Sequence, residues 1–312
     1  MRTGSANHDR VLARARAWAG APMALATVIE TWRSAPCPVG THMLVHADGR
    51  FVGSVSGGCV EGDVLQIAAD VIAGAPSVLR RYGVADGTAW EVGLPCGGDI
   101  QVLVQPVSES GYAAELFDRI IDARQSGHTL HVGTDLDSGF SRQIEASNDA
   151  AFVNAYPPPR RLLIVGAVEI AASLAAIAAS QGFAVTLCDP RSRFLTVDRF
   201  PDIILDDRWP DEAIAVFSPD NRSAVVTLSH DPKIDDPALI AVLASPAAYI
   251  AALGSKTSHA ARLLRLTSAG ASVDQLARIE EPAGVAINAI SAPEIALSIA
   301  AGMIRAFNDG LR

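Results

Sequence analysis

The sequence predicts an α/β protein in which a Rossmann-like, doubly wound parallel sheet follows a smaller mixed α+β domain. Beyond residue 160, short apolar strands alternate with helical stretches, an order that is typical of parallel sheets. Before that point, strands outnumber helices and a hairpin signal is present. Residues 156–160 read Tyr-Pro-Pro-Pro-Arg, a stiff segment that neither a helix nor an inner strand accommodates. We therefore expect an N-terminal domain at 1–155, a proline linker at 156–160 and a Rossmann-like domain at 161–312.

The N-terminal domain is predicted to hold three helices among short strands. Asp48-Gly49 is a strong two-residue turn signal, so residues 43–46 and 51–55 are expected to form a hairpin. Residues 113–125 carry apolar side chains at helical spacing, which predicts an amphipathic helix. The other predicted elements are helices at 9–20 and 63–72 and strands at 24–31, 78–82, 90–92 and 100–104.

The C-terminal domain is predicted to alternate strands with helices. Pro293 suits the first turn of a closing amphipathic helix at 293–307, because proline is tolerated where a helical N–H has no partner. Cys188 ends an apolar strand, so we expect it in the core. The predicted strands are 162–165, 185–188, 203–205, 224–228 and 249–253, and the helices between them include 170–180, 237–244 and 258–269.

The turn after the first strand of this domain departs from the dinucleotide-binding pattern. A Rossmann unit normally shows Gly-x-Gly-x-x-Gly here, and an acid after the second strand binds the ribose. Gly166 and Asp189 fit that pattern, but the second glycine position holds Val168, whose side chain blocks close approach of a pyrophosphate. Glu169 adds a negative charge where a phosphate would need a positive one. We therefore expect the Rossmann fold without tight NAD(P) binding.

Composition and charge exclude several classes of function. The chain has 312 residues and a net charge of −9, which argues against a nucleic-acid partner. Its four cysteines show no CxxC spacing, so the sequence predicts neither a zinc site nor a disulfide framework. Residues 1–16 lack the apolar core of a secretory signal, and no apolar run is long enough to cross a membrane. We expect a cytoplasmic protein with reduced thiols.

Two glycine–cysteine turns are the candidate functional motifs of the N-terminal domain. The first contains Ser56, Gly57, Gly58 and Cys59 between a predicted strand and a predicted helix, and the second contains Cys96, Gly97 and Gly98. Main-chain N–H groups in such a turn converge, and a helix N-terminus adds partial positive charge. The same field raises the thiolate fraction of a cysteine. The turns therefore suit an anion, a soft metal or a reactive sulfur, although a single such motif would be read as an ordinary turn with a buried cysteine.

A second group of candidates follows strands of the C-terminal domain. His230 lies just after the strand at 224–228, at the edge where doubly wound sheets bind ligands, and both a structural role and a ligand contact are open for it. Lys233, Ser255 and Lys256 also follow predicted strands and belong to the same candidate crevice. His42 and His46 fall in the predicted hairpin, so we expect them at the surface.

Several segments resemble the XdhC/CoxI family of accessory factors for molybdenum hydroxylases. They are Gly-Ser-Val-Ser-Gly-Gly-Cys-Val-Glu-Gly-Asp from residue 53, the run from Cys96 to Pro106, Asp-Pro-Arg at 189–191, Ser-His-Asp-Pro-Lys at 229–233 and Tyr-Ile-Ala-Ala-Leu-Gly-Ser at 249–255. The resemblance implies a chaperone, more than an enzyme, that binds the mature molybdenum cofactor and holds it while a terminal ligand is exchanged for sulfur. It also implies delivery to an apo xanthine dehydrogenase-type hydroxylase, a cysteine desulfurase as sulfur donor, and a homo-oligomeric protein.

The resemblance also suggests roles for individual residues. Molybdopterin carries a phosphate and a dithiolene-bound metal, and Cys59 or Cys96 would contact molybdenum, which accepts thiolate ligands. Glu61 belongs to the same motif and is a candidate cofactor-binding residue, as is His230. The chain differs from the family pattern where Arg33 replaces a glycine, Cys37 replaces a commonly basic residue, Val168-Glu169 replaces Gly-His, and Ile290 replaces a basic residue.

Two other functions compete with the chaperone. The Rossmann-like domain and Asp189 would suit an NAD(P)-dependent oxidoreductase. Cys59 and Cys96 alone would suit a thiol-based sulfur carrier that uses no molybdenum.

Overall fold

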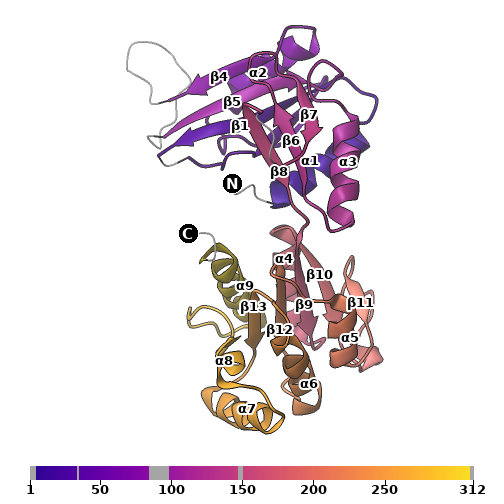
Figure 1. Ribbon diagram of the computed structural model, residues 1–312, viewed down its shortest axis with the longest axis vertical. Helices are drawn as coiled ribbons and strands as arrows, with labels where there is room; N and C mark the ends of the chain where they lie inside the picture. Colours follow the sequence, from indigo (N-terminus) through magenta and orange to yellow (C-terminus); the bar gives the residue numbers. More distant parts are fainter. Residues whose placement is uncertain (1–4, 34, 84–97, 147–149, 310–312) are drawn as a thin grey trace. The chain divides into compact units, whose positions relative to one another are not determined.

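The computed structural model describes residues 5–33, 35–83, 98–146 and 150–309. The chain divides between Pro158 and Pro159 into two compact units, which are called here the N-terminal unit and the C-terminal unit (Figure 1). The boundary lies in the three-proline segment, where the backbone can neither continue a helix nor pair as an inner strand.

The described residues of the N-terminal unit form two antiparallel sheets. The five-stranded sheet has the order β3-β2-β1-β5-β4, and the three-stranded sheet has the order β7-β6-β8. In the central pair, Leu25 lies opposite Gln105, and the register shifts once between Val28 and Glu30. The strands are β1 (Met23–Trp32), β2 (His42–His46), β3 (Phe51–Gly53), β4 (Val78–Tyr82), β5 (Asp99–Pro106), β6 (Leu130–Thr134), β7 (Ser141–Ile144) and β8 (Phe152–Tyr156).

Within the described ranges of this unit, three helices cover the two faces of the five-stranded sheet: α1 (Ser5–Ala17), α2 (Glu61–Ile72) and α3 (Glu115–Gln125). Successive side chains of a strand point to opposite faces, so β1 contributes to two cores. Ala26 of β1 packs in the core formed with Val64 of α2. Leu25 of β1 packs with Leu12 of α1 and Ile120 of α3. Burial of a large side chain such as Leu25 contributes roughly 1.5–3 kcal/mol. Because β1 takes part in both cores, it joins the helices on the two faces of the sheet.

The C-terminal unit is built on a six-stranded, all-parallel sheet. Its order is β11-β10-β9-β12-β13-β14, so the chain moves outward in one direction from β9 and then returns to continue on the other side. The point between β9 and β12 is the topological switch, where open α/β sheets bind ligands. The strands are β9 (Arg160–Val165), β10 (Phe183–Cys188), β11 (Ile204–Asp206), β12 (Ser223–Thr227), β13 (Tyr249–Ala252) and β14 (Ile279–Glu280).

Helices cover both faces of this sheet, as in a doubly wound fold. Leu162 and Ile164 face α4 and α9, whereas Leu163 and Val165 face α5, α6 and α7 (Figure 1). The predicted fold class is therefore confirmed. The helices are α4 (Glu169–Ser180), α5 (Pro210–Phe217), α6 (Pro232–Leu243), α7 (Lys256–Ser268), α8 (Val273–Leu276) and α9 (Ala292–Asp309), with a short 3₁₀ turn η1 (Ser192–Phe194).

The boundaries of some elements differ from the predictions for local reasons. Helix α6 begins at Pro232, well before the predicted residue 237, because the Asp231 side chain accepts a hydrogen bond from the Lys233 N–H and caps the helix. The second strand of the hairpin stops at Gly53, where φ is +85°. The predicted strand at 90–92 lies outside the described residues.

The prediction that His42 lies at the surface is wrong. His42 is 3% exposed, and its Nδ1 lies 2.9 Å from Thr27 Oγ1 while its Nε2 lies 2.7 Å from the Tyr156 hydroxyl. It is buried because β2 is an inner strand and this side chain faces the layer between the sheets, beside the buried His8. His46, at the end of the same strand, is half-buried. Cys188 is fully buried, as predicted.

Candidate functional site

The first glycine–cysteine turn connects β3 to α2. Gly57 and Gly58 have φ values of +79° and +123°, a backbone conformation that other residues rarely adopt. Gly53 has φ +85°, and a Cβ there would overlap the His42 carbonyl oxygen. The glycines therefore allow the chain to leave the sheet edge and fold back over the start of α2.

The main-chain N–H groups of this turn converge on the side chain of Glu61. Its carboxylate accepts hydrogen bonds from the N–H groups of Val55 at 3.1 Å, Ser56 at 2.9 Å and Gly58 at 2.8 Å. It also accepts from the hydroxyls of Ser54 and Ser56. Burial alone would raise the pKa of Glu61, but these donors outweigh burial and lower that pKa to about 2.

This geometry changes the interpretation of the turn. The sequence predicted a nest of N–H groups for an external anion, and the structure shows that the nest holds a carboxylate of the protein itself. Ser56 is 1% exposed, and its hydroxyl also accepts from the Val60 N–H at 3.0 Å, so its polar groups are used inside the fold. Ser56, Gly58 and Glu61 therefore build the turn, and a phosphate would have to displace Glu61 in order to use the same donors.

Cys59 lies at the exposed end of the turn, directly before the first turn of α2. The structure therefore presents Cys59 to the outside, while the residues around it fix the backbone. Of the residues predicted for this turn, Cys59 is the one whose side chain is free to meet a ligand.

A second thiol lies against the same turn. Cys37 is half-buried, and its thiol contacts the Ser54 hydroxyl and the Gly57 N–H. Burial is the largest influence on its pKa and, together with the charge of Glu61, raises that pKa above the ordinary value of 9.0. In the sequence, Cys37 stood out only as a departure from the family pattern. Its position between two prolines was a signal that its backbone is fixed.

The second glycine–cysteine motif lies mostly outside the described residues, which include Gly98 but neither Cys96 nor Gly97. Gly98 is buried and directly precedes β5. At the end of β4, the Tyr82 hydroxyl donates to Asp63 of α2 at 2.7 Å, and Tyr82 lies opposite Ile100 of β5. The residues that flank the motif are thus fixed beside the first turn of α2, close to the turn that carries Cys59.

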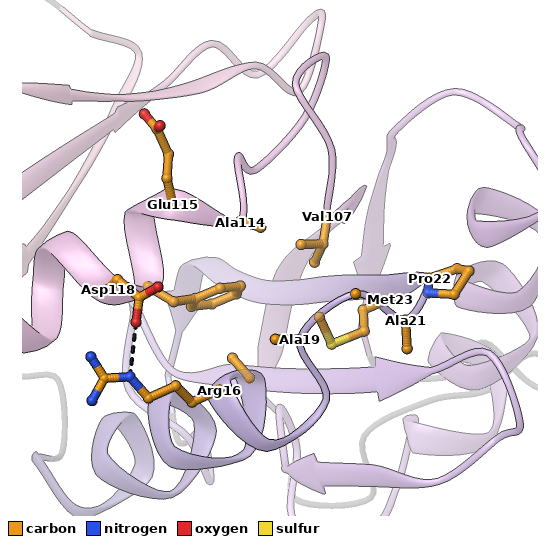
Figure 2. Close-up of a pocket in the computed structure, with 12 residues that line it drawn as sticks. Arg16, Ala19, Ala21, Pro22, Met23, Val107, Ala114, Glu115 and Asp118 are labelled. Atoms are coloured by element: carbon orange, nitrogen blue, oxygen red, sulfur yellow. Dashed lines mark hydrogen bonds and ion pairs between the residues drawn. The ribbon is translucent and has the colours of Figure 1, made fainter.

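A pocket of about 450 Å³ lies elsewhere in the N-terminal unit, between α1 and α3 (Figure 2). Most of its wall is apolar and includes Met23, Val107 and Phe117. At its rim, Arg16 Nε lies 2.8 Å from Asp118 Oδ1, and both side chains are exposed (Figure 2). None of the predicted site residues that the structure describes lines this pocket, and its described lining offers no thiol or imidazole.

In the C-terminal unit, the turn after β9 is bonded to other residues of the protein. The Asp189 carboxylate accepts from the Ala167 N–H at 2.8 Å and pairs with Arg191 at 2.7 Å. Burial would raise the pKa of Asp189, but the bonds from Arg191 and Ala167 lower it. A Cβ on Gly166 would lie 2.8 Å from the Ser229 nitrogen, so this turn also packs closely against the end of β12. Asp189 is therefore engaged in the position where a ribose-binding acid would act.

His230 follows β12, as predicted, and its side chain is exposed. It has φ +61°, which is uncommon for a residue other than glycine, and its N–H donates to Asp235 at 3.1 Å. Lys233 and Lys256 lie exposed in the first turns of α6 and α7, and Ser255 caps α7. The structure places these residues at the carboxyl ends of the neighbouring strands β12 and β13.

A buried polar cluster that the sequence did not predict lies at the same edge. It is formed by Asp235, His259, Arg262 and Glu281. Arg262 pairs with Glu281 and lies 3.8 Å from Asp235, and His259 lies 2.5 Å from Glu281. The spacing of His259 and Arg262 on one helical face, directly after a strand, was the available signal. Which carboxylates these side chains meet depends on strand order, which the sequence does not show.

The described ranges contain no group of three or more histidine, cysteine, aspartate or glutamate side chains arranged to hold a metal ion. Among the helices of these ranges, none is both long and apolar enough to cross a membrane.

Comparisons with known proteins agree with this architecture. The XdhC and CoxI family profile matches residues 17–83, and the XdhC Rossmann domain profile matches residues 162–303. The chain is 28% identical over 286 residues to the molybdenum cofactor insertion chaperone PaoD of Escherichia coli K12, which covers 89% of this chain and 81% of that protein. It is 26% identical over 312 residues to a Bacillus subtilis 168 protein named as a probable xanthine dehydrogenase subunit, with 90% and 92% covered.

A solved structure shows the same fold. The crystal structure of a protein titled a xanthine dehydrogenase, from Bacillus halodurans, superposes with a TM-score of 0.82 at 26% identity, and 96% of each chain is covered. The two family profiles fall on separate units, and together they include the turn that carries Cys59 and the parallel sheet that carries His230. With these matches, and with the fold and motifs described above, the chain belongs to the XdhC and CoxI family.

Proposed function

We propose that this protein binds the molybdenum cofactor and supports maturation of a xanthine dehydrogenase-type molybdenum hydroxylase. The observation that carries the proposal is Cys59, an exposed thiol on a turn whose backbone is fixed by the buried Glu61 carboxylate. Membership of the family supports it, as does similarity to a protein named for molybdenum cofactor insertion. The cofactor is cargo in this proposal, so the protein needs a site that holds it and releases it.

The residues of the turn suit such a site. Thiolate is a ligand that soft metal centres accept, and a single exposed thiol allows exchange. The Glu61 network holds the backbone on both sides of Cys59, which lowers the entropy lost when a ligand is bound. Cys96 is proposed as the second contact to molybdenum, because the residues that flank its segment are fixed beside α2.

The finer steps belong to the same proposal. The protein would hold the cofactor while sulfur from a cysteine desulfurase replaces a terminal ligand, and it would then deliver the cofactor to the apo-hydroxylase in the cytoplasm. In this role the protein works as a chaperone and homo-oligomer, and catalyses no reaction of its own. The two units correspond to the proposed cofactor domain and Rossmann-like domain.

The test is cofactor content. The full-length protein, produced in cells that make molybdopterin and purified with its candidate hydroxylase, is assayed for pterin and molybdenum. We expect both in the wild-type protein and a loss of at least tenfold in Cys59→Ser. Ser138→Ala, an exposed serine in the same unit, is the control and should retain both. Folded wild-type protein that contains neither pterin nor molybdenum would contradict the proposal.

The exposed Cys59 also favours a second candidate, a sulfur carrier that works without molybdenum. In that case the purified protein would carry a persulfide on Cys59 in cells that cannot make molybdopterin. Intact-protein mass spectrometry distinguishes the two, because a persulfide adds one sulfur to the mass and disappears on reduction. A persulfide together with full loss of pterin would favour the carrier.

A further inference from the structure

The turn that carries Cys59 has a second thiol beside it, which the proposed function does not use. Cys37 lies in the loop between β1 and β2 and is half-buried, whereas Cys59 is exposed. Pro36 and Pro38 flank Cys37 and restrict its backbone. An accessible thiol next to a more protected one is typical of redox-sensitive sites, in which the second cysteine resolves the oxidised form of the first.

The contacts of Cys37 bracket Cys59 along the chain. Its thiol contacts the Gly57 N–H, two residues before Cys59, and the charge of Glu61, two residues after Cys59, acts on it. Its side chain also packs against the core that contains Val60, the residue directly after Cys59. The loop between β1 and β2 therefore lies against the turn on both sides of the exposed thiol.

The chain between these contacts is short enough for the two sulfur atoms to meet. Two residues of extended chain, the separation of Gly57 from Cys59, span about 7 Å at most. The two loops are close, because a Cβ on Gly57 would lie 3.7 Å from Pro36 Cβ. A disulfide needs Cα atoms roughly 4.4–6.8 Å apart. Gly57 and Gly58 are exposed, and glycine changes its φ at little steric cost, so a local rotation can turn the Cys59 side chain toward Cys37.

The difference in exposure sets the order in which the two thiols react. Burial, together with the charge of Glu61, raises the pKa of Cys37, so this thiol reacts slowly with dissolved oxidants. Cys59 is exposed and meets an oxidant first. Once Cys59 is modified, Cys37 is already held against the same turn, and its attack is an intramolecular step that dissolved thiols cannot match in rate.

We propose that Cys37 and Cys59 form a reversible disulfide, which withdraws the Cys59 thiol from ligands under oxidising conditions and returns it on reduction. Transient, redox-sensing bonds are the usual kind of disulfide in cytosolic proteins. The inference rests on the proposed function only in its consequence, because an oxidised protein has no Cys59 thiol to offer to molybdenum. Cys37 stands at a position where the chain departs from the family pattern, so the pair is a property of this chain.

The oxidant is a low-molecular-weight disulfide such as oxidised glutathione. The Cys59 thiolate attacks one of its sulfurs, the S–S bond of the oxidant breaks, and one glutathione leaves as a thiolate. The Cys37 thiol then loses its proton to water, attacks the Cys59 sulfur and displaces the second glutathione. Two protein thiols lose two electrons in total, and one glutathione disulfide is reduced to two thiols. An excess of reduced glutathione reverses both steps.

Oxidised glutathione is also the probe. The full-length protein, produced in cells that cannot make molybdopterin, is reduced, incubated with the probe, quenched with acid and digested without a reductant. Mass spectrometry should find the peptides of Cys37 and Cys59 joined, and the intact protein should have lost two hydrogens and carry no glutathione. Cys37→Ser should stop at one glutathione on Cys59, with at least tenfold more of this adduct than the wild type. Cys96→Ser is the control for the other candidate thiol and should form the same link as the wild type.

A wild-type protein that keeps glutathione on Cys59, or that joins Cys59 to Cys96, would overturn the pair. A link between Cys37 and Cys59 that is no more frequent in native protein than in urea-unfolded protein would do the same, and this comparison needs no variant that has to fold. Pterin content separates the two proposals. A protein whose two thiols never join, yet which retains pterin, loses the switch alone, whereas one that forms the link and never holds pterin when reduced loses the chaperone role.

Discussion

The Glu61 carboxylate lies 2.8 Å from the main-chain nitrogen of Gly58 and accepts its hydrogen bond. This contact closes the turn that presents Cys59, because Glu61 on the first turn of α2 reaches back to the loop that precedes it. The arrangement resembles the reciprocal bonding of helix caps, in which a side chain inside the helix satisfies N–H groups before it. A charge-assisted bond of this kind contributes about 1.5–3 kcal/mol.

Replacing Glu61 with Gln should therefore loosen the turn. The amide keeps one acceptor oxygen but has no charge, and its NH₂ group faces N–H donors. We expect the free energy of unfolding to fall by about 2 kcal/mol, measured by urea denaturation at pH 7. Glu145→Gln, an exposed carboxylate in the same unit, is the control and should be neutral.

The pKa of Glu61 predicts the pH range of this contribution. That pKa falls from an ordinary 4.5 to about 2 on folding, so the unfolded chain binds the proton more readily. The stabilisation is complete above pH 4.5 and is lost as the pH falls toward 2. In Glu61→Gln, the part of the stability curve between these values should be flatter than in the wild type, and an unchanged slope would contradict the role assigned to Glu61.

The buried His8 should produce a separate acid transition at higher pH. Burial lowers its pKa from 6.5 to about 4, and its Nε2 lies 3.0 Å from the Gly40 carbonyl. The unfolded state therefore takes up a proton first as the pH falls. Stability is fully present above pH 6.5 and declines toward pH 4, by roughly 3 kcal/mol in total.

The measurement is the urea midpoint between pH 7.5 and 4.5, followed through tryptophan fluorescence. Trp18 contributes to this signal, and it packs in the core that contains Tyr156, the ring beside His8. His8→Gln should lower stability at neutral pH and reduce the pH slope. The buried His42 has a pKa lowered by burial and contributes in the same direction, so some slope should remain. A wild-type midpoint that does not change over this range would show that these histidines are not buried as neutral rings.

The sequence predicted those features of the fold that depend on neighbouring residues, and it did not predict those that depend on three-dimensional packing. The apolar strand from Leu162 to Val165, and the order of strands and helices after it, are local features, and the sequence predicted them. The distribution of these four side chains over two cores became visible only in the structure. The occupant of the Ser56 nest was not predicted, because which side chain turns back into a loop depends on three-dimensional packing. On the basis of its motif, Glu61 was predicted to bind the cofactor, although the same motif equally suits a residue that caps the start of a helix.

The cluster around His259 shows the same limit in another form. Its members come from α6, α7 and the residue after β14, and they meet because β12, β13 and β14 are neighbours in the sheet. Sequence reasoning could place Ser255 and Lys256 at a strand end one at a time. It could not join them to Glu281, because the pairing of β13 with β14 is a long-range contact without a local signal.

Gly166 provides a test of the turn after β9. It has φ +108°, and a Cβ would lie 2.8 Å from the Ser229 nitrogen, so Gly166→Ala adds a steric collision to backbone strain. Gly270, with φ +98° and no atom within 4 Å of its added Cβ, is the matched control in the same unit. We expect Gly270→Ala to cost about 1 kcal/mol, and Gly166→Ala to cost clearly more. Equal costs in denaturant titrations would show that the Ser229 loop moves aside freely.

The three cysteines that the structure describes should react in a fixed order. Cys59 is exposed, Cys37 is half-buried and Cys188 is buried, and the reactive species in alkylation is the thiolate. Burial raises the pKa of Cys37, and burial together with the charge of Asp206 raises the pKa of Cys188 to about 12. Iodoacetamide at pH 7.5, quenched over time and followed by peptide mass spectrometry, should modify Cys59 first, Cys37 at least tenfold more slowly, and Cys188 only after denaturation.

In Glu61→Gln, the loosened turn should bring the labelling rate of Cys37 closer to that of Cys59. The reason is that Ser54 and Gly57, which contact the Cys37 thiol, belong to the Glu61 network. Rapid labelling of Cys37 in the wild type would mean that the turn is already open, and then the presentation of Cys59 could not depend on Glu61.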